Sequence, residues 1–270
     1  MKILNKIACV LALCLGATGI ALAEPPDLSN PAFKNYTDGK RYTGFVISDP
    51  TTREMQLDDI QNPSMIWVEN GEALWSQVEG EAGKSCASCH KEPSVMKGKS
   101  ASYPKVSKES GKLITVEHQI NNCRTEQMKA NAWKWESDEM LSVSSLVRLQ
   151  SRGMPVQVKI DGEAAPFYAK GKAFYEQRRG QLDMACVHCH VQNHGKHVRS
   201  ELLSQGLPNG FPTYRLKWQK LGSLHRRFRG CNKNIRAEPY KQGAPEYTEL
   251  ELYVMSRANG LPVESPSVRK

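Results

Sequence analysis

The hydrophobic pattern of the chain repeats itself. Two trios of apolar residues share the i, i+3, i+4 spacing of an amphipathic helix. The first trio is Val143, Leu146 and Val147, and the second is Leu250, Tyr253 and Val254. Each trio is followed by the same order of helix-ending residues, as Gly-Met-Pro-Val at 153–156 and Gly-Leu-Pro-Val at 260–263. The pattern predicts two equivalent helices, each ending shortly before its glycine.

A second pair of matching segments lies upstream of these helices. Residues 71–75 read Gly-Glu-Ala-Leu-Trp, and residues 171–175 read Gly-Lys-Ala-Phe-Tyr. The repeat offset is 100 here and 107 at the closing helices, so about seven extra residues fall in the second loop. Trp75 and Tyr175 are expected in the core, where opening and closing helices pack. No stretch has a strong strand pattern, and we predict a mainly α fold built by internal duplication.

The N-terminus has the pattern of a secretory signal peptide. Lys2 and Lys6 precede an apolar stretch over residues 7–21, and Ala-Leu-Ala at 21–23 provides a cleavage site. The apolar run is interrupted by glycine and is shorter than the roughly 20 residues that span a bilayer. We therefore predict a signal peptide over 1–23, export to the periplasm, and no membrane anchor after cleavage.

Residues 24–70 have no counterpart in the repeat. They contain Pro25, Pro26, Pro31 and Pro50, and we expect an extended segment that wraps the first domain. The predicted domains are residues 71–160 and 161–270.

Composition and charge narrow the function classes. The hydrophobic fraction of 39% and the charged fraction of 24% are ordinary for a globular protein. The formal charge of +9 becomes +7 when residues 1–23 are removed, because they hold two lysines and no acid. A basic chain favours acidic partners or anionic substrates. Nucleic acid is not expected, since the protein is exported, acids are scattered among the bases, and no recognition motif is present.

The pentapeptide Cys-x-x-Cys-His occurs twice, at 86–90 and 186–190. Two cysteines at this spacing reach the vinyl-derived carbons of one haem, and the histidine that follows meets the iron. A zinc site or a redox-active dithiol does not require that histidine. We predict two covalently attached haem c groups, bound through Cys86 and Cys89 and through Cys186 and Cys189, with His90 and His190 as iron ligands.

Two further cysteines occupy equivalent places in the repeat. Cys123 lies 30 residues before Gly153, and Cys231 lies 29 residues before Gly260. We predict that each is the second axial ligand of its haem. A disulfide between them is the first alternative, because an oxidising compartment favours it. Ligation by His118 and His225, a few residues upstream, is the second.

Other potential ligands fit less well. Five methionines have no matched positions in the two loops, so most of them are expected in the core. They are Met96, Met128, Met140, Met184 and Met255. His194 and His197 follow His190 too closely to reach the other haem face, so they are expected at the surface.

The surroundings of the two cysteines differ in charge. The segment 225–231, His-Arg-Arg-Phe-Arg-Gly-Cys, surrounds Cys231 with cations, whereas Gln119 stands where Arg227 would be in the first half. A guanidinium near sulfur can bind an oxyanion through two hydrogen bonds and lower the pKa of the thiol. A solvated basic face is the alternative interpretation.

These features resemble known families. An opening helix with Gly and an aromatic residue that crosses a closing helix resembles class I cytochrome c domains. The Arg227-x-x-x-Cys231 pattern, the segment 61–67 running into 71–75, and the pair Cys123-Arg124 resemble the SoxA family over nearly the whole mature chain. The resemblance implies two haems with His/Cys ligation and a heterodimer with a SoxX-like cytochrome c subunit.

The resemblance also implies a reaction. Thiosulfate would be joined oxidatively to a cysteine of a SoxYZ-like carrier protein, as in an L-cysteine S-thiosulfotransferase. Cys231 would then be both iron ligand and sulfur-transfer site, and Arg227 would bind thiosulfate, so the catalytic residues are expected in the second domain. A dihaem electron carrier without sulfur chemistry is the alternative. A dihaem peroxidase fits less well, because it needs an open haem face.

Overall fold

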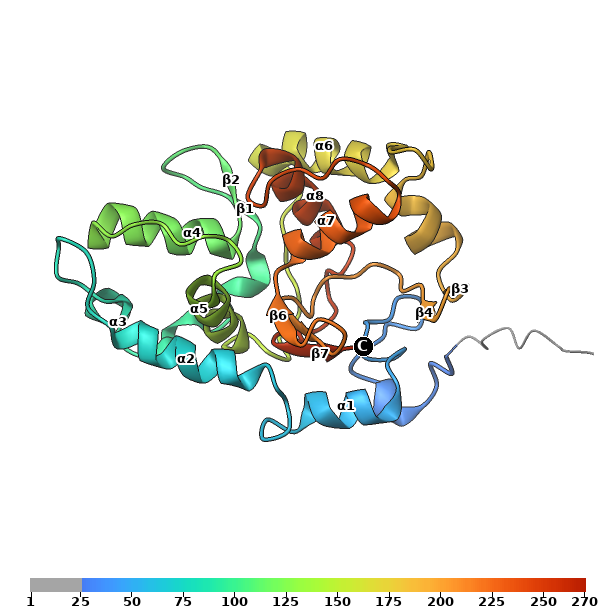
Figure 1. Cartoon of the computed structure of the whole chain (residues 1–270), viewed down its shortest axis with the longest axis horizontal. Helices are drawn as coiled ribbons and strands as arrows, with labels where there is room; N and C mark the ends of the chain where they lie inside the picture. The colour runs from blue at the N-terminus through green and yellow to red at the C-terminus, as the bar shows by residue number, and fades with distance from the viewer. Residues whose placement is uncertain (1–25) are drawn as a thin grey trace, which may run out of the picture.

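Two crossed helix pairs form the framework of the molecule. The structure is a computed structural model that describes residues 26–270, so the predicted signal peptide lies outside the described residues. In the first half, α2 (Met65–Ser76) packs against α5 (Asp138–Leu149), and in the second half, α6 (Ala165–Glu176) packs against α8 (Pro245–Ser256) (Figure 1). These are the predicted opening and closing helices, and the mainly α prediction is confirmed.

Each crossing depends on a glycine. A Cβ atom at Gly71 would lie 2.6 Å from the carbonyl oxygen of Ser142, and one at Gly171 would lie 2.0 Å from that of Glu249. Any side chain there would push the helices apart. The glycines of the two matching segments are thus explained by close backbone approach, and the aromatic residues four positions later, Trp75 and Tyr175, are buried as expected.

The polypeptide between the helices of each pair carries the cysteines. In the first half, α3 (Cys86–His90) begins at the N-cap Ser85, and α4 (Val116–Asn122) leads into a π-helical turn, η4 (Cys123–Met128). In the second half, the π-helical turn η6 (His188–Gln192) is followed by α7 (Leu224–Asn234).

The remaining elements are short. The 3₁₀ turns are η1 (Pro31–Phe33), η2 (Pro93–Met96), η3 (Ser100–Ser102) and η5 (Gly162–Ala164). The antiparallel hairpins are β1–β2 (Lys105–Val106 and Leu113–Ile114) and β3–β4 (His197–Val198 and Glu201–Leu202). A three-stranded sheet places β5 (Thr213–Arg215) between antiparallel β6 (Lys220–Gly222) and parallel β7 (Ser267–Arg269). The longer loop of the second half thus holds two hairpins where the first holds one.

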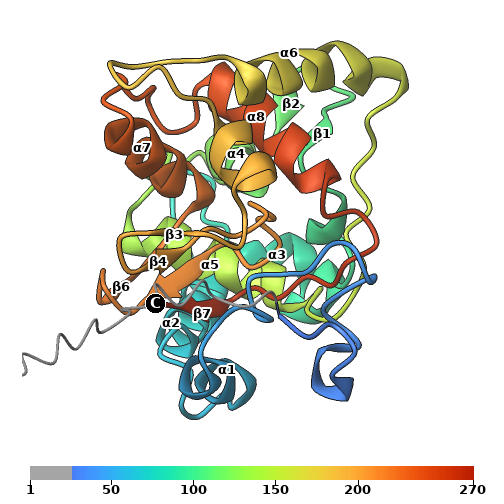
Figure 2. The same ribbon diagram turned by 90° about the vertical axis from the view of Figure 1, so that its right-hand side faces the viewer.

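The N-terminal segment differs from its prediction. It contains a regular helix, α1 (Pro50–Leu57), which lies beside β7 in both views (Figures 1 and 2). Arg152 pairs with Asp59 of the segment, whereas Arg41 of the segment donates to the carbonyl oxygen of Arg257. The segment therefore contacts both halves, and most of its hydrogen bonds to other parts of the chain are to the second half, whereas we expected it to wrap the first domain.

The two halves share one interior. Their Gly-x-Pro-Val segments pair with each other, since Gly153 N donates to Val263 O and Val263 N donates to Met154 O, both at 2.8 Å. The core cluster beside this pairing contains residues of both halves, including Val156, Leu252 and Met255. Among residues 26–270, no helix is long and apolar enough to cross a membrane.

Candidate haem sites and active site

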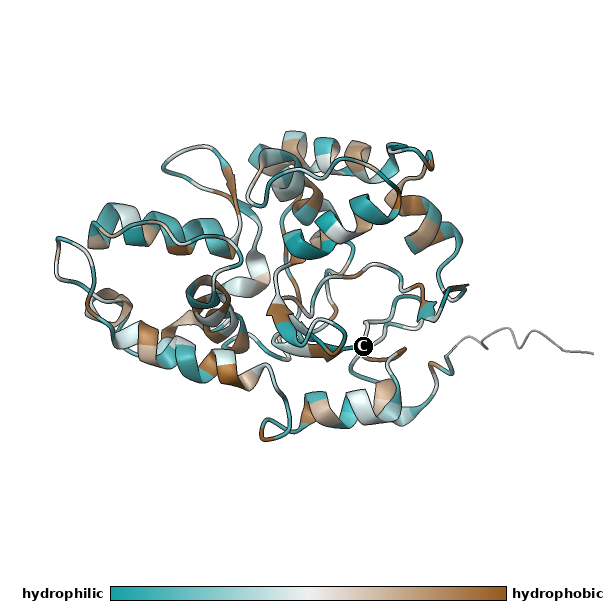
Figure 3. Cartoon of the chain, in the orientation of Figure 1, coloured by the Kyte–Doolittle hydropathy of each residue, from teal (hydrophilic) through white to brown (hydrophobic). Residues whose placement is uncertain are grey.

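The second site joins two segments that are distant in sequence. Cys186, Cys189 and His190 follow α6, and Cys231 lies on α7, a strongly hydrophilic helix (Figure 3). Burial and the nearby Cys231 thiol raise the pKa of Cys186 to about 12 and also raise the pKa of Cys189. The three thiols and one imidazole predicted from sequence are therefore gathered in one place.

His190 is fixed by its backbone neighbours. Its Nδ1 lies 2.8 Å from the carbonyl oxygen of Ser204, which accepts a hydrogen bond from the protonated nitrogen. A Cβ atom at Gly206 would come within 2.8 Å of the imidazole Cγ, so only glycine lets the backbone pass the ring this closely. Because Nδ1 donates, Nε2 is the nitrogen left to bind a metal, which is the usual arrangement of a ligating histidine.

The surroundings of Cys231 favour the thiolate form of its side chain. Burial raises its pKa, but the Arg227 guanidinium and the neighbouring His190 outweigh burial and bring the pKa to about 7. Ser223 caps α7 by accepting from Arg226 N, which sets the helix so that Arg227 lies one turn before Cys231. A thiolate is both the form that binds iron and the nucleophilic form.

The first site has the same plan with different neighbours. Burial and Cys123 raise the pKa of Cys86, which places these two thiols together. The Cys123 sulfur accepts a hydrogen bond from Gln119 Nε2 at 3.4 Å, and the His90 ring lies 5.9 Å from that of Trp75. The amide of Gln119 therefore occupies the place that a guanidinium takes in the second half.

The donor sets fit covalently bound haem. Each site offers the two thiols and the imidazole of its pentapeptide together with one further thiol, and the six cysteines of the described part of the chain are all free of disulfides. No group of three or more His, Cys, Asp or Glu side chains within residues 26–270 is close enough to hold a metal ion unaided. Sets of this kind suit an iron whose equatorial ligands come from a porphyrin.

The alternatives from sequence are less consistent with the geometry. His118 Nε2 lies 3.2 Å from Gly243 O, while His225 Nδ1 accepts from Gly243 N at 2.9 Å and its Nε2 lies 3.1 Å from Glu251. Both rings pack on Trp135 between the halves, so bis-histidine ligation is not what this arrangement offers. Cys123 and Cys231 are unpaired in separate sites, which argues against the disulfide.

The other predicted positions are as expected. Met128, Met140 and Met255 are buried, and His194 and His197 are exposed.

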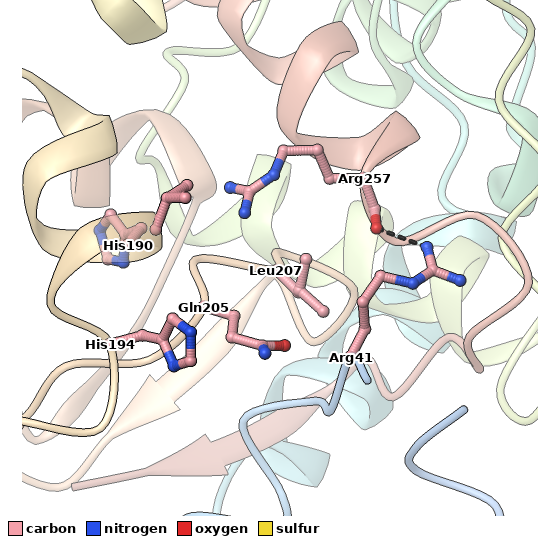
Figure 4. Close-up of a pocket in the computed structure, with 7 residues that line it drawn as sticks. Arg41, His190, His194, Gln205, Leu207 and Arg257 are labelled. Atoms are coloured by element: carbon pink, nitrogen blue, oxygen red, sulfur yellow. Dashed lines mark hydrogen bonds between the residues drawn. The ribbon is translucent and has the colours of Figure 1, made fainter. Parts of the chain in front are cut away.

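Several residues at the second site were not found from sequence. A cavity of about 410 Å³ beside His190 is lined by Arg41, His194, Gln205, Leu207 and Arg257, among others (Figure 4). Arg215 is buried, and the charges of Arg227 and Cys231 influence its pKa. The N-terminal segment and β5 contribute Arg41 and Arg215, and neither element has a counterpart in the first half. Comparison of the halves therefore could not reveal them.

Comparison with known proteins agrees with this arrangement. Residues 70–156 match the family model for the SoxA/TsdA cytochrome c domain. The chain is 47% identical to the L-cysteine S-thiosulfotransferase subunit SoxA of Paracoccus pantotrophus, over 96% of this chain and 95% of that protein. It is 45% identical to the subunit of the same name from Rhodovulum sulfidophilum, over 84% of this chain and 79% of that protein.

A solved structure is similar along most of the chain. The crystal structure of SoxXA from P. pantotrophus matches with a TM-score of 0.83 and 47% sequence identity, covering 85% of this chain and 87% of that chain. Identity at this level extends over 95% of the first relative and so includes both halves of the chain. The chain belongs to the SoxA family of cytochrome c subunits.

Proposed function

We propose that the chain is the dihaem subunit of a periplasmic L-cysteine S-thiosulfotransferase, which joins thiosulfate oxidatively to a cysteine of a SoxYZ-like carrier. The names of the relatives support the activity. The observation that carries the assignment to the second half is the Cys231 thiol, whose pKa is brought to about 7 despite burial by Arg227 and His190. A thiol whose pKa is lowered toward neutral pH by a neighbouring guanidinium is suited to reaction with a sulfur oxyanion.

Two haem c groups would be held by the residues described above. Cys86, Cys89 and His90, with Cys123 opposite, would hold the first haem. Cys186, Cys189 and His190, with Cys231 opposite, would hold the second. Arg41 and Arg257 border the cavity beside His190 and would pair with haem carboxylates (Figure 4). When bound, the second haem supplies the redox centre that accepts electrons from sulfur.

The protein side chains would act on the sulfur compounds. Arg227 binds the sulfonate oxygens of thiosulfate and directs its outer sulfur at Cys231. A sulfur–sulfur bond forms between the Cys231 thiolate and thiosulfate, and two electrons leave. The carrier thiolate then attacks the outer thiosulfate sulfur, takes the thiosulfonate group, and releases Cys231 as the thiolate. Overall, one carrier thiol and one thiosulfate give one carrier S-thiosulfonate, one proton and two electrons.

The partners follow from the same relatives. The similarity to SoxXA supports a SoxX-type cytochrome subunit as the electron acceptor. The excess of basic residues would favour an anionic substrate and the approach of an acidic carrier segment. Export of the chain by its N-terminal segment would place all three proteins in the periplasm.

The proposal is tested by reconstitution. The haem-loaded complex of this chain with its SoxX-type partner is mixed with reduced carrier, thiosulfate and an oxidised electron acceptor. Mass spectrometry of the carrier should show one thiosulfonate group per reactive cysteine, with two electrons passed to the acceptor. Reduction of the haems by thiosulfate without modification of the carrier would instead support the plain electron-carrier alternative.

A further inference from the structure

Arg215 is a buried cation with no role in the reaction proposed above. It is the last residue of β5, and its side chain is only 8% exposed. The parallel pairing of β5 with β7 brings the backbone oxygen of Lys270 to this guanidinium, which donates to it from Nε at 2.9 Å and from Nη2 at 2.7 Å. Because two hydrogen bonds hold one edge of the guanidinium, its position is fixed before any ligand arrives.

The guanidinium belongs to the surroundings of Cys231. Burial and the neighbouring Arg227 lower the pKa of Arg215 to about 10, whereas Glu201 and Cys231 raise it. The Arg215 guanidinium also lies 5.1 Å from the centroid of the Trp218 ring, and Arg226, the residue before Arg227 on α7, lies 4.5 Å from the same centroid. The guanidinium from β5 therefore lies beside the part of α7 that carries Arg227 and Cys231. Like charges this close repel, and an anion between them relieves the repulsion.

A carboxylate already stands at this pair. Glu201 Oε2 lies 3.4 Å from Arg215 Nη2, and its Oε1 lies 2.5 Å from Lys217 Nζ. Arg227 also contributes to lowering the pKa of Glu201, after the larger opposing effect of burial and the effects of Lys217 and Arg215. Glu201 is carried by the short β3–β4 hairpin, in which residues 196–200 are exposed. A short hairpin at the surface can move at low cost.

We propose that Arg215 and Arg227 together bind the sulfonate end of thiosulfate beside Cys231, and that the Glu201 carboxylate occupies this place until the anion displaces it. This inference rests on the proposed function and names the binding site for its substrate. A sulfonate and a carboxylate present similar pairs of oxygens to a guanidinium, so they compete for the same donors. Displaced Glu201 keeps its second partner, Lys217.

The same chemistry would also be present on the modified carrier. A cysteine S-thiosulfonate ends in the same sulfonate group as free thiosulfate. Binding measurements with thiosulfate alone distinguish free thiosulfate from the modified carrier as the source of the bound sulfonate group, since no carrier is then present.

A matched control lies at the same tryptophan. Arg226 is next to Arg227 on α7, and its guanidinium lies 4.5 Å from the Trp218 ring centroid, while that of Arg215 lies 5.1 Å from it. Arg226 faces Glu136 at 3.8 Å instead of Glu201. Arg226→Gln therefore removes the same charge and a similar stacking contact without removing a ligand of the proposed anion.

The test uses the haem-loaded complex with its SoxX-type partner. Arg215→Gln should raise the KM for thiosulfate and weaken thiosulfate binding about tenfold or more, the loss expected for hydrogen bonds to a charged group. Arg215→Lys, which keeps the charge, should fall between Arg215→Gln and the unchanged chain. Glu201→Gln should lower KM and tighten binding about two- to tenfold, because the competing carboxylate loses its charge. Arg226→Gln should leave both within about twofold.

Two kinds of result would overturn the inference. Weaker thiosulfate binding in Glu201→Gln would show that the carboxylate supports the site instead of occupying it, and equal losses in Arg215→Gln and Arg226→Gln would show a bulk charge effect. Calorimetric titration with thiosulfate, without carrier, gives this answer independently of turnover. Absence of turnover in the unchanged complex would count against the proposed function. Normal turnover in the unchanged complex, together with unaltered KM and thiosulfate binding in the Arg215 and Glu201 variants, would count against this binding site alone.

Discussion

The two halves of the molecule share a framework and differ in what faces their unpaired cysteines. Each half crosses an opening and a closing helix at a glycine, and each places its cysteine eight residues after a helix N-cap, Thr115 or Ser223. In the first half, the neutral Gln119 amide lies 3.4 Å from the Cys123 sulfur, whereas in the second the cation Arg227 lowers the pKa of Cys231. The difference teaches that the two halves share the arrangement of their cysteine sites, whereas charge distinguishes one site from the other.

The nearby arginines of the two halves are used differently. Arg124, next to Cys123, is buried, pairs with Glu79 at 2.6 Å and stacks 3.6 Å from the Trp133 ring centroid. It is committed to packing. Arg215 of the second half instead comes from an added sheet and stands beside Arg227. Arg215 also pairs with a carboxylate, that of Glu201, but the second site thus has two arginines, Arg215 and Arg227, where the first has Arg124 alone.

The largest difference between the halves is expected from loss of the cysteines. Cys231→Ala should reduce thiosulfate-dependent modification of the carrier by about a thousandfold or more, because the covalent step loses its nucleophile. Cys123→Ala should leave this rate within about threefold, since Cys123 would only help to hold the first haem. Initial rates of carrier modification by the reconstituted complex measure both. Equal losses in the two variants would erase the distinction between the sites.

The next largest effect should come from making the second site resemble the first. Arg227→Gln should lower kcat/KM for thiosulfate about 10- to 100-fold, the range for losing hydrogen bonds to a charged partner. Gln119→Ala, the equivalent change in the first half, should have no measurable effect on kcat/KM. Steady-state kinetics with thiosulfate as the varied substrate provides the measurement. A comparable loss in Gln119→Ala would assign anion binding to both halves.

A moderate effect is expected at the helix crossings, where the halves should behave alike. Gly171→Ala and Gly71→Ala should each lower the free energy of unfolding by about 1–3 kcal/mol, because the added methyl group meets a carbonyl oxygen of the facing helix. The loss should be larger for Gly171, whose Cβ would lie at 2.0 Å instead of 2.6 Å.

Urea unfolding followed by circular dichroism gives these free energies. Gly230→Ala is the control, since a Cβ there meets no atom within 4 Å. It should be neutral or slightly stabilising because alanine favours the helix. Tolerance of both crossing variants would contradict the close approach of the helices.

The smallest effect concerns the contact between the halves. Burial lowers the pKa of His118, so the unfolded chain takes up a proton before the folded chain as pH falls below about 6.5. Arg148 keeps the pKa of Glu117 low despite burial, so protonation of this carboxylate at lower pH acts in the same direction. The free energy of unfolding should therefore decrease from pH 7 to pH 5.

Unfolding midpoints in urea across this range test the effect. His118→Gln should flatten the decrease, whereas His197→Gln, at an exposed position, should not. An unchanged slope in His118→Gln would show that His118 is not a source of the pH dependence.

The sequence was sufficient where the two halves could be compared with each other. The glycines, core aromatic residues, closing helices and haem motifs occupy matched positions, and each follows from a short-range rule of spacing. The equivalence of Cys123 and Cys231 was found in the same way. Their role as axial ligands stays a prediction, because it depends on a haem group.

Features without a counterpart in the other half could not be found by that comparison. Arg215 lies sixteen residues before Cys231 and reaches the site only because β5 pairs with β7 near the end of the chain. Arg41 and α1 come from a segment that was expected to be extended around the first domain. Their positions depend on long-range pairing and packing, which no local pattern reports.

The central claim is that the sulfur chemistry belongs to Cys231 and not to Cys123. The most direct measurement is peptide mass spectrometry of the oxidised, haem-loaded complex after brief exposure to thiosulfate without carrier. We expect a sulfur-containing adduct on the peptide that carries Cys231, which added carrier removes, and no adduct on the peptide that carries Cys123. An adduct on Cys123, or none on Cys231 in a preparation that modifies the carrier, would contradict the account.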